Sequence, residues 1–326
     1  PMLGKAKTSA KVEVDFRGSG TTYSLFRIRH VYFNLDWGKS ALLVGQTWHP
    51  LYGDVAPEIL NLNMGAPYQP FSRAPQIRYR FTSNNFMLTA AAIWQSQYLS
   101  VGPKTNKPGE TSTRKSQEFM KKSCVPEFYL GVDYKRPGLI AGAGLHVSSI
   151  TPRTQSETED AVYFVNERVT GISGEAHVKY TKENWLVSAK TVLGTNLTQT
   201  STVGGYGITS IDEVTGKQQY SPLRTSSTWV NVAYGKKWRP ALFFGYLKNL
   251  GATKEVPYGA LGTGTTLDQL FTGTAELTYN IPHWKFGAEY SLCNAWYGDE
   301  FDAKAKAINS HSILNHRIVL VALFQF

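Results

Sequence analysis

Apolar and polar residues alternate along most of this chain. Every second residue is apolar in segments such as 12–16, 77–81 and 128–134, and charged residues fill many of the positions between them. Successive side chains of a β-strand point to opposite sides, so this pattern predicts strands with one apolar and one charged face. The apolar faces read Val12, Val14 and Phe16; Ile77, Tyr79 and Phe81; Phe128, Leu130, Val132 and Tyr134; and Trp284, Phe286, Ala288 and Tyr290.

The connections between about 14 predicted strands alternate between short and long. The short ones fall at 38–39, 83–84, 136–138, 182–184, 236–239 and 281–282, and the long ones at 50–72, 99–125, 152–165, 199–224, 251–266 and 298–310. Only the turn at 18–22 is short where the alternation requires a long connection. Outer-membrane barrels have tight turns at one end and long loops at the other. The chain is therefore predicted to be a single all-β domain over residues 1–326, a transmembrane antiparallel up-and-down β-barrel of about 14 strands, with 16 also compatible.

Composition supports a membrane barrel and excludes a bundle of membrane helices. The mean hydropathy is -0.27, and no apolar stretch approaches the roughly 20 residues that a spanning helix needs. Several apolar faces end in Tyr or Trp beside a short turn, which predicts an aromatic belt at one membrane edge. Two cysteines, Cys124 and Cys293, are too few for a disulfide scaffold and leave open a single bridge or two free thiols.

The second predicted strand departs from the pattern. In 23–37, the residues Val31, Phe33, Leu35 and Trp37 share a face with Arg27 and Arg29. Arginine facing lipid near the bilayer midplane costs about 2–4 kcal/mol. We therefore expect either a bulge that switches the register near His30, or a second subunit that covers this outer surface.

The charged face is expected to line a wet lumen, and its cations are the candidate functional residues. A pore acts through the shape and charge of its lumen rather than by making bonds. The predicted pore-lining residues are Arg17, Arg78, Arg80, Lys135, Lys179 and Lys285. The net charge of +10 is compatible with a pore for anions, an acidic membrane surface or nucleic acid. Nucleic acid is disfavoured, because the basic residues of 99–125 lie in a loop without a recognised nucleic-acid motif.

The long connection at 49–75 is the candidate constriction loop. Together with Trp48 it carries aromatic residues, five prolines and apolar residues that are unusual in a solvated loop. Such a segment is expected to fold into the barrel. Its Asp54 and Glu58 could then oppose Arg17, Arg78 and Arg80 on the wall and create a transverse field. The alternative is that these charges only solvate the lumen and form structural pairs.

Enzymatic chemistry has little support in the sequence. The seven histidines show no HExxH or Cys/His spacing, and no GxSxG elbow is present. Ser312 and His316 share a strand face but stand about 13 Å apart. No catalytic residue, metal or cofactor is predicted, and the protein is not expected to be an enzyme.

One hairpin carries a family resemblance. Residues 26–38, FRIRHVYFNLDWG, followed by LVGQTW at 43–48, resemble a barrel hairpin of DcaP-like and related trimeric porins. Phe326 resembles the signal by which the outer-membrane assembly machinery takes up barrel precursors. The resemblance implies a trimeric passive channel of the bacterial outer membrane that favours small anionic solutes. Those porins have 16 strands, so a count of about 14 implies a missing hairpin before Pro1, two merged strands or a smaller barrel.

The predicted function is an outer-membrane porin for passive diffusion of small hydrophilic solutes, with a preference for anions. Its expected partners are the lipid bilayer with outer-leaflet lipopolysaccharide, small anionic or neutral solutes, and two further copies in a homotrimer, but no nucleic acid. The alternatives are a plugged, non-channel barrel that acts in binding or assembly, and last a barrel enzyme acting on outer-leaflet lipid.

Overall fold

One antiparallel sheet dominates the structure. A computed structural model describes residues 2–16, 25–61 and 65–326. The wall strands are β2 (Ala6–Asp15), β3 (Arg27–Asp36), β4 (Ser40–Trp48), β5 (Arg73–Ser83), β6 (Phe86–Ile93), β9 (Glu127–Arg136), β10 (Leu139–Ile150), β13 (Val169–Lys182), β14 (Trp185–Thr195), β16 (Gln218–Tyr234), β17 (Trp238–Ala252), β19 (Leu267–Ile281), β20 (Trp284–Phe301) and β21 (Ala307–Phe324). Each pairs with the next in this order. The predicted all-β, up-and-down fold is confirmed.

Shorter elements extend the sheet or fill its loops. At the short-turn end, β1 (Met2–Leu3) pairs with the start of β2. At the long-loop end, β15 (Gly204–Ile211) pairs with the first six residues of β16, 218–223, and with β18 (Ala260–Thr263). The hairpins β7 (Val101–Pro103) with β8 (Thr113–Lys115) and β11 (Gln155–Glu157) with β12 (Val162–Phe164) lie in long loops. The helix α1 (Glu118–Ser123) lies between β8 and β9, and the 3-10 turn η1 (Thr198–Thr200) lies between β14 and β15.

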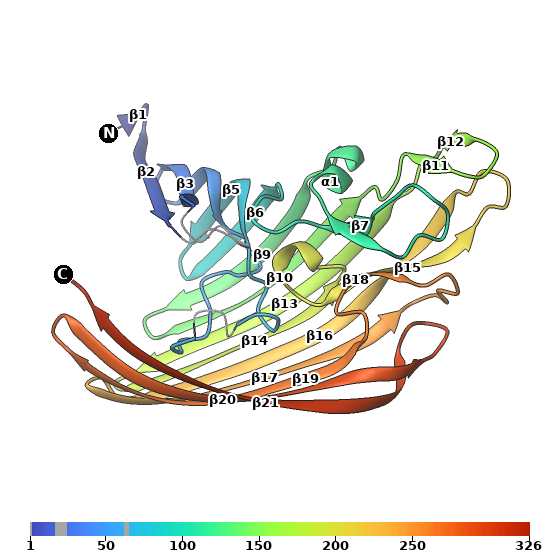
Figure 1. Cartoon of the computed structure of the whole chain (residues 1–326). Helices are drawn as coiled ribbons and strands as arrows, with labels where there is room; N and C mark the ends of the chain where they lie inside the picture. The colour runs from blue at the N-terminus through green and yellow to red at the C-terminus, as the bar shows by residue number, and fades with distance from the viewer. Residues whose placement is uncertain (1, 17–24, 62–64) are drawn as a thin grey trace.

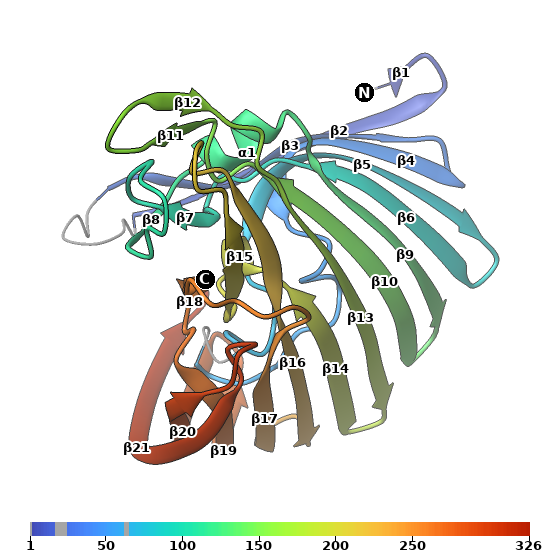
Figure 2. The ribbon, with the colours of Figure 1, turned by 90° about the vertical axis from the view of Figure 1, so that its right-hand side faces the viewer.

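The sheet curves strongly around a central space (Figures 1 and 2). Both chain ends lie at the end of the short turns, and β2 and β21 form opposite edges of the sheet. Among the described residues, no pairing joins β2 to β21, so ring closure is not part of this structure. The two edge strands run antiparallel to each other along the wall, because the strands alternate in direction from β2 to β21.

The predicted alternation of connections is present. Short turns occupy 37–39, 84–85, 137–138, 183–184, 235–237 and 282–283, and longer connections occupy 49–72, 94–126, 151–168, 196–217 and 253–266. The last connection, 302–306, is shorter than the predicted 298–310, because β20 and β21 continue their pairing to Phe301 and Ala307. The turn predicted at 18–22 lies outside the described residues.

The two faces of the sheet have opposite chemistry. Large apolar side chains such as Ile77, Ile172 and Leu320 are 57%, 64% and 77% exposed on the convex side. Charged side chains such as Lys190 and Glu289 are each only 2% exposed on the concave side. Burying charge while exposing apolar surface is unfavourable in water, but it suits a wall that faces lipid outside and polar groups inside.

The irregularity predicted near His30 is a β-bulge. The register shifts where Glu13 pairs with His30 and Val14 pairs with Ile28, so Arg29 is the extra residue of β3. The bulge brings Arg27 and Arg29 to the side of Asp15 and Glu13, where Arg27 donates two hydrogen bonds to Asp15, at 2.9 and 2.6 Å. The first of the two predicted explanations is therefore confirmed.

Aromatic side chains gather at the end of the short turns. Cross-strand ring pairs lie there with centroids 4.6 to 5.2 Å apart: Trp238 with Tyr279, Trp185 with Tyr234, Trp284 with Phe324 and Phe86 with Tyr134. Such pairs fit the aromatic girdle of a membrane wall. Cys124 and Cys293 are both free thiols. Within the described residues, no helix is long and apolar enough to cross a membrane.

Candidate channel constriction

The loop 49–72 folds back onto the concave face of the sheet. Figure 2 shows this segment, which connects β4 to β5, within the curve of the wall. Leu51, Val55 and Tyr68 are at most 1% exposed. Leu51 packs in a cluster with wall residues such as Tyr129, whereas Val55 and Tyr68 pack with Trp229 and others. Burial of these apolar residues fixes the loop inside the wall.

Asp54 lies between two wall cations. Its carboxylate contacts Lys135 Nζ at 2.5 Å and Arg80 NH2 at 3.8 Å. Burial acts to raise the pKa of Asp54, but the hydrogen bond and charge of Lys135 and the charge of Arg80 outweigh it. The pKa of Asp54 therefore lies below its ordinary value. The carboxylate is ionised at neutral pH and holds this part of the loop on β5 and β9.

Glu58 forms a second ion-pair anchor further along the loop. Glu58 Oε1 accepts a hydrogen bond from Lys179 Nζ at 2.6 Å, and Oε2 accepts one from Arg239 NH2 at 3.0 Å. Lys179 is a predicted pore-lining residue. Arg239 falls in a connection in the sequence-based prediction, but β17 begins one residue earlier and places it on the inner wall. Both loop carboxylates thus contact wall cations directly.

Wall groups that sequence reasoning did not select hold the loop backbone. The amide of Leu60 donates to Glu276 Oε2 at 2.6 Å, and the amide of Asn61 donates to Glu289 Oε2 at 3.1 Å. Lys190 Nζ donates to the carbonyls of Leu51 and Tyr52, at 3.0 and 2.7 Å. The alternation along the strands indicates that Glu276, Glu289 and Lys190 point inward. Their partners are backbone groups of the loop, which no pattern of side chains reveals.

The remaining predicted pore-lining residues have different surroundings. Arg78 is buried, and it donates to Gln76 Oε1 at 2.8 Å and to the carbonyl of Trp48. Lys285 is half-buried on β20, and in the described part of the chain it has no ion pair. Arg17 lies outside the described residues. The structure therefore brings Arg80, Lys135 and Lys179 to the two loop carboxylates, and their role in a pore stays a prediction.

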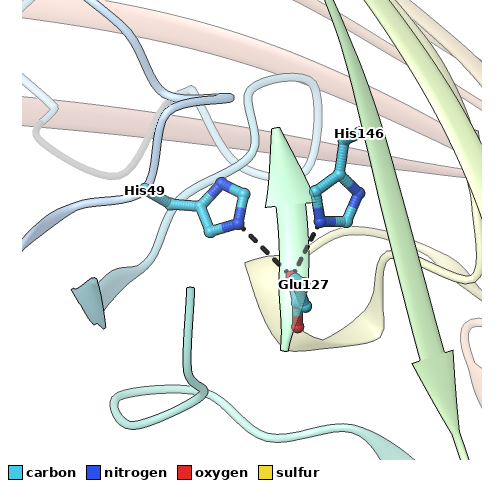
Figure 3. A group of neighbouring side chains, drawn as sticks. All are labelled: His49, Glu127 and His146. Atoms are coloured by element: carbon cyan, nitrogen blue, oxygen red, sulfur yellow. Dashed lines mark hydrogen bonds and ion pairs between the residues drawn. The ribbon is translucent and has the colours of Figure 1, made fainter. Parts of the chain in front are cut away.

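A buried carboxylate ties the start of the loop to the wall. Figure 3 shows the rings of His49 and His146 pointing at Glu127. Glu127 Oε2 lies 2.8 Å from His146 Nε2, 3.4 Å from His49 Nε2 and 3.1 Å from Gln199 Nε2, and Oε1 lies 2.7 Å from Gln95 Nε2. We call these five residues the Glu127 hub. It joins the loop 49–72 to β9, to β10 and to the two loops after β6 and β14.

The Glu127 hub has distances that would suit a metal, but its hydrogen bonds do not. The ligand atoms of His49, Glu127 and His146 lie within 4.8 Å of one another. His49 Nδ1 accepts a hydrogen bond from the amide of Leu51 at 3.2 Å, so the proton of its neutral ring is on Nε2. Burial lowers the pKa of His49, which keeps that ring neutral. Since Nε2–H donates to Glu127, it has no lone pair for a metal, and the cluster acts as a hydrogen-bonded anchor.

Asp54 makes the anchoring of the loop dependent on pH. Its folded-state pKa is depressed, so its stabilising contribution is present above the unfolded-state pKa of about 4 and is lost as the pH falls through the lower, folded-state value. We expect wild type and Asp54→Asn to differ in thermal unfolding midpoint by a constant amount from pH 7 to about pH 4, and to converge in stronger acid. A difference that grows on acidification would contradict this assignment.

Comparisons with known proteins place the fold. No family model and no curated protein sequence matches the chain. Among solved structures, the outer-membrane channel DcaP of Acinetobacter baumannii superposes with a TM-score of 0.70 at 17% identity, covering 99% of this chain and 82% of DcaP. The anion-selective porin of Comamonas acidovorans superposes with a TM-score of 0.55 at 11% identity, covering 98% of this chain and 84% of that porin. The trimer form of OmpT, an outer-membrane protein of Vibrio cholerae, superposes with a TM-score of 0.54 at 12% identity, covering 99% of this chain and 87% of OmpT.

The chain therefore has the fold of the bacterial outer-membrane porins. Among these structures its wall resembles that of DcaP, as the hairpin at 26–48 predicts. At these identities the similarity concerns the fold.

Proposed function

We propose that this protein is a passive channel of the bacterial outer membrane for small hydrophilic solutes, with a preference for anions. The observation that carries the proposal is the loop 49–72, which is anchored to a polar inner wall by ion pairs at Asp54 and Glu58. A loop fixed in this way narrows the lumen at a defined level. The neighbouring structures include a channel and an anion-selective porin, which supports the same class of function.

Wall cations contact both carboxylates of the loop. Each loop carboxylate faces two wall cations: Asp54 faces Lys135 and Arg80, and Glu58 faces Lys179 and Arg239. The wall also carries carboxylates here, since Asp133 lies 4.0 Å from Lys135 and Glu276 lies 3.9 Å from Arg239. These four cations and four carboxylates balance, so the proposed preference for anions rests on the net charge of +10 of the whole chain, because positive potential attracts anions.

The channel is proposed to act as a homotrimer in a bilayer whose outer leaflet contains lipopolysaccharide. The trimeric form of one neighbouring structure supports this assembly. A trimer places part of the exposed apolar wall of each copy against its partners, while the rest faces lipid.

Planar-bilayer conductance under a salt gradient tests the proposal. We expect ohmic channels whose reversal potential indicates anion selectivity. A cation-selective reversal potential would contradict the anion preference. Absence of conductance, together with the failure of sugars to swell proteoliposomes, would contradict the channel and favour a plugged barrel that acts in binding or assembly.

A further inference from the structure

A second polar site lies at the long-loop end of β3, β4 and β5. A cavity of about 280 Å³ is lined there by Arg27, Ile28, Gln46, Arg73, Ser96, Gln97 and Tyr98. In register, Gln46 pairs with Val31 and Ile28 pairs with Val14, both of which belong to the exposed, apolar face. The cavity therefore lies at the long-loop edge of these strands, with Gln46 and Ile28 from the outward face and Arg27 from the side of Asp15.

Arg73 is a buried cation without an anionic partner. Its side chain is 4% exposed, and its guanidinium carbon lies 3.7 Å from the ring centroid of Trp48. Its Nε is buried without a hydrogen-bond partner, and no carboxylate of the described residues lies within ion-pair distance. Residues 1, 17–24 and 62–64 contain no Asp or Glu, so the remainder of the chain offers none either. The rings of Trp48 and Phe71 lie beside this charge, with centroids 3.7 and 5.9 Å from its guanidinium carbon.

The other cations near the cavity are compensated. Arg27 donates to both oxygens of Asp15, and Arg29 donates to Glu13 at 2.7 Å. Among the described cations that line the cavity, Arg73 is left without a counter-charge at ion-pair distance, and burial of an unpaired charge is unfavourable. Cation–π contact with Trp48 offsets part of this cost. An anion in the cavity would complete the compensation.

From this we propose that the cavity binds an oxyanion, either a phosphate or a carboxylate group, with Arg73 as its principal ligand. The planar guanidinium presents donors that match such groups, and Gln97, Ser96 and Tyr98 line the same cavity with further polar atoms. A water molecule takes about 30 Å³ of liquid volume, so the space accommodates an oxyanion and part of the molecule that carries it. The proposal goes beyond conduction and does not depend on it.

The position of the cavity suggests where such a group could come from. Arg73 and Phe81 are the two ends of one outward face of β5, roughly 26 Å apart along the strand. This length is comparable to the ~25 Å apolar band of outer-membrane barrels. Arg73 therefore lies near the edge of that band on the long-loop side, at the level of lipid phosphates, and is also within reach of dissolved anions.

Calorimetric titration with inorganic phosphate, in zwitterionic detergent at low ionic strength, tests the site. We expect wild type to bind one phosphate per chain at this site, and Arg73→Gln to lower the affinity at least about tenfold, which equals 1.4 kcal/mol. Arg73→Lys keeps the positive charge but loses the planar, paired N–H donors of the guanidinium group. Its phosphate affinity should therefore lie between those of wild type and Arg73→Gln. Arg136→Gln is the matched control, since Arg136 is exposed at the other end of the wall. Equal binding by wild type and Arg73→Gln would overturn the proposal.

A second arm identifies the source of the anion. Native mass spectra are recorded after incubation with lipid A or with its dephosphorylated form. Retention of the phosphorylated lipid by wild type but not by Arg73→Gln indicates a lipid phosphate. Phosphate binding without a preference for the phosphorylated lipid indicates a free oxyanion. Both results support the site.

A third measurement addresses subunit contacts and folding. If wild type binds no phosphate and Arg73→Gln dissociates the oligomer, the partner of Arg73 is a group of another copy, and the proposal fails. Heat-modifiable migration in SDS gels verifies that each variant is folded. If Arg73→Gln does not fold, Arg73→Lys carries the comparison with wild type.

Discussion

Replacing Glu58 with glutamine is expected to make the channel about tenfold more selective for anions. The change removes the negative charge that lies between Lys179 and Arg239 and leaves both cations on the wall. Two unit charges about 6 Å apart in water interact with about 0.7 kcal/mol, which changes the local concentration of a permeating ion about threefold. Loss of the carboxylate raises this concentration for anions and lowers it for cations, so their ratio changes about tenfold. The reversal potential under a salt gradient measures the effect.

The fold should survive this substitution. Glu58 and Lys179 are partly exposed, and pairs of this kind contribute about 0.2–1 kcal/mol. Glu213→Gln is the matched control, because Glu213 is an exposed loop carboxylate with no ion pair in the described part of the chain. A shift of Glu58→Gln toward cations, or an equal shift in the control, would show that Glu58 does not face the permeation path.

The substitution Glu127→Gln is expected to cause the largest loss of stability. The carboxylate of the Glu127 hub accepts hydrogen bonds from four side chains, whereas a glutamine accepts with one oxygen and presents a donor where the other oxygen lies. Hydrogen bonds to a buried charge contribute about 1.5–3 kcal/mol each, so we expect a loss of about 3 kcal/mol or more in the free energy of unfolding. Urea unfolding followed by heat-modifiable gel migration measures it.

Because the hub includes His49, the same variant should loosen the start of the constriction loop. We expect Glu127→Gln to show greater open-channel current noise than wild type. Glu118→Gln is the control, since Glu118 is half exposed on α1 and pairs only with Arg114 in the described structure. If the free energy of unfolding and the open-channel current noise of Glu127→Gln equal those of wild type, the Glu127 hub does not anchor the loop.

The sheet could be predicted because its signal is local. The alternation in segments such as 77–81 reports which side each residue faces, and it is readable without knowledge of the neighbouring strand. The bulge at Arg29 was predictable only as a conflict in that alternation, because it depends on how β2 and β3 pair. The length of the last loop depended on how far two strands continue to pair, which no turn residue specifies.

The contacts of the constriction were less predictable. The sequence selected Asp54, Glu58, Arg80, Lys135 and Lys179 as charges on a loop and an inner wall. It set both carboxylates opposite Arg17, Arg78 and Arg80, and of these Arg80 contacts Asp54 in the described structure. The other pairings depend on where the loop descends within the wall. Arg239 was missed because the predicted strand boundary lay beyond it, and Glu276 and Glu289 because they bind backbone amides rather than side chains.

The sequence by itself determined an antiparallel wall with an apolar and a charged face, short turns at one end, long loops at the other and an inward-folding loop at 49–72. These properties depend on residue order over a few positions. Only the tertiary structure decided that His49, Glu127 and His146 form one hub, that the loop carboxylates contact wall cations, and that Arg73 remains unpaired. Those contacts join residues far apart in the chain, and the register of the strands and the path of the loops set their distances.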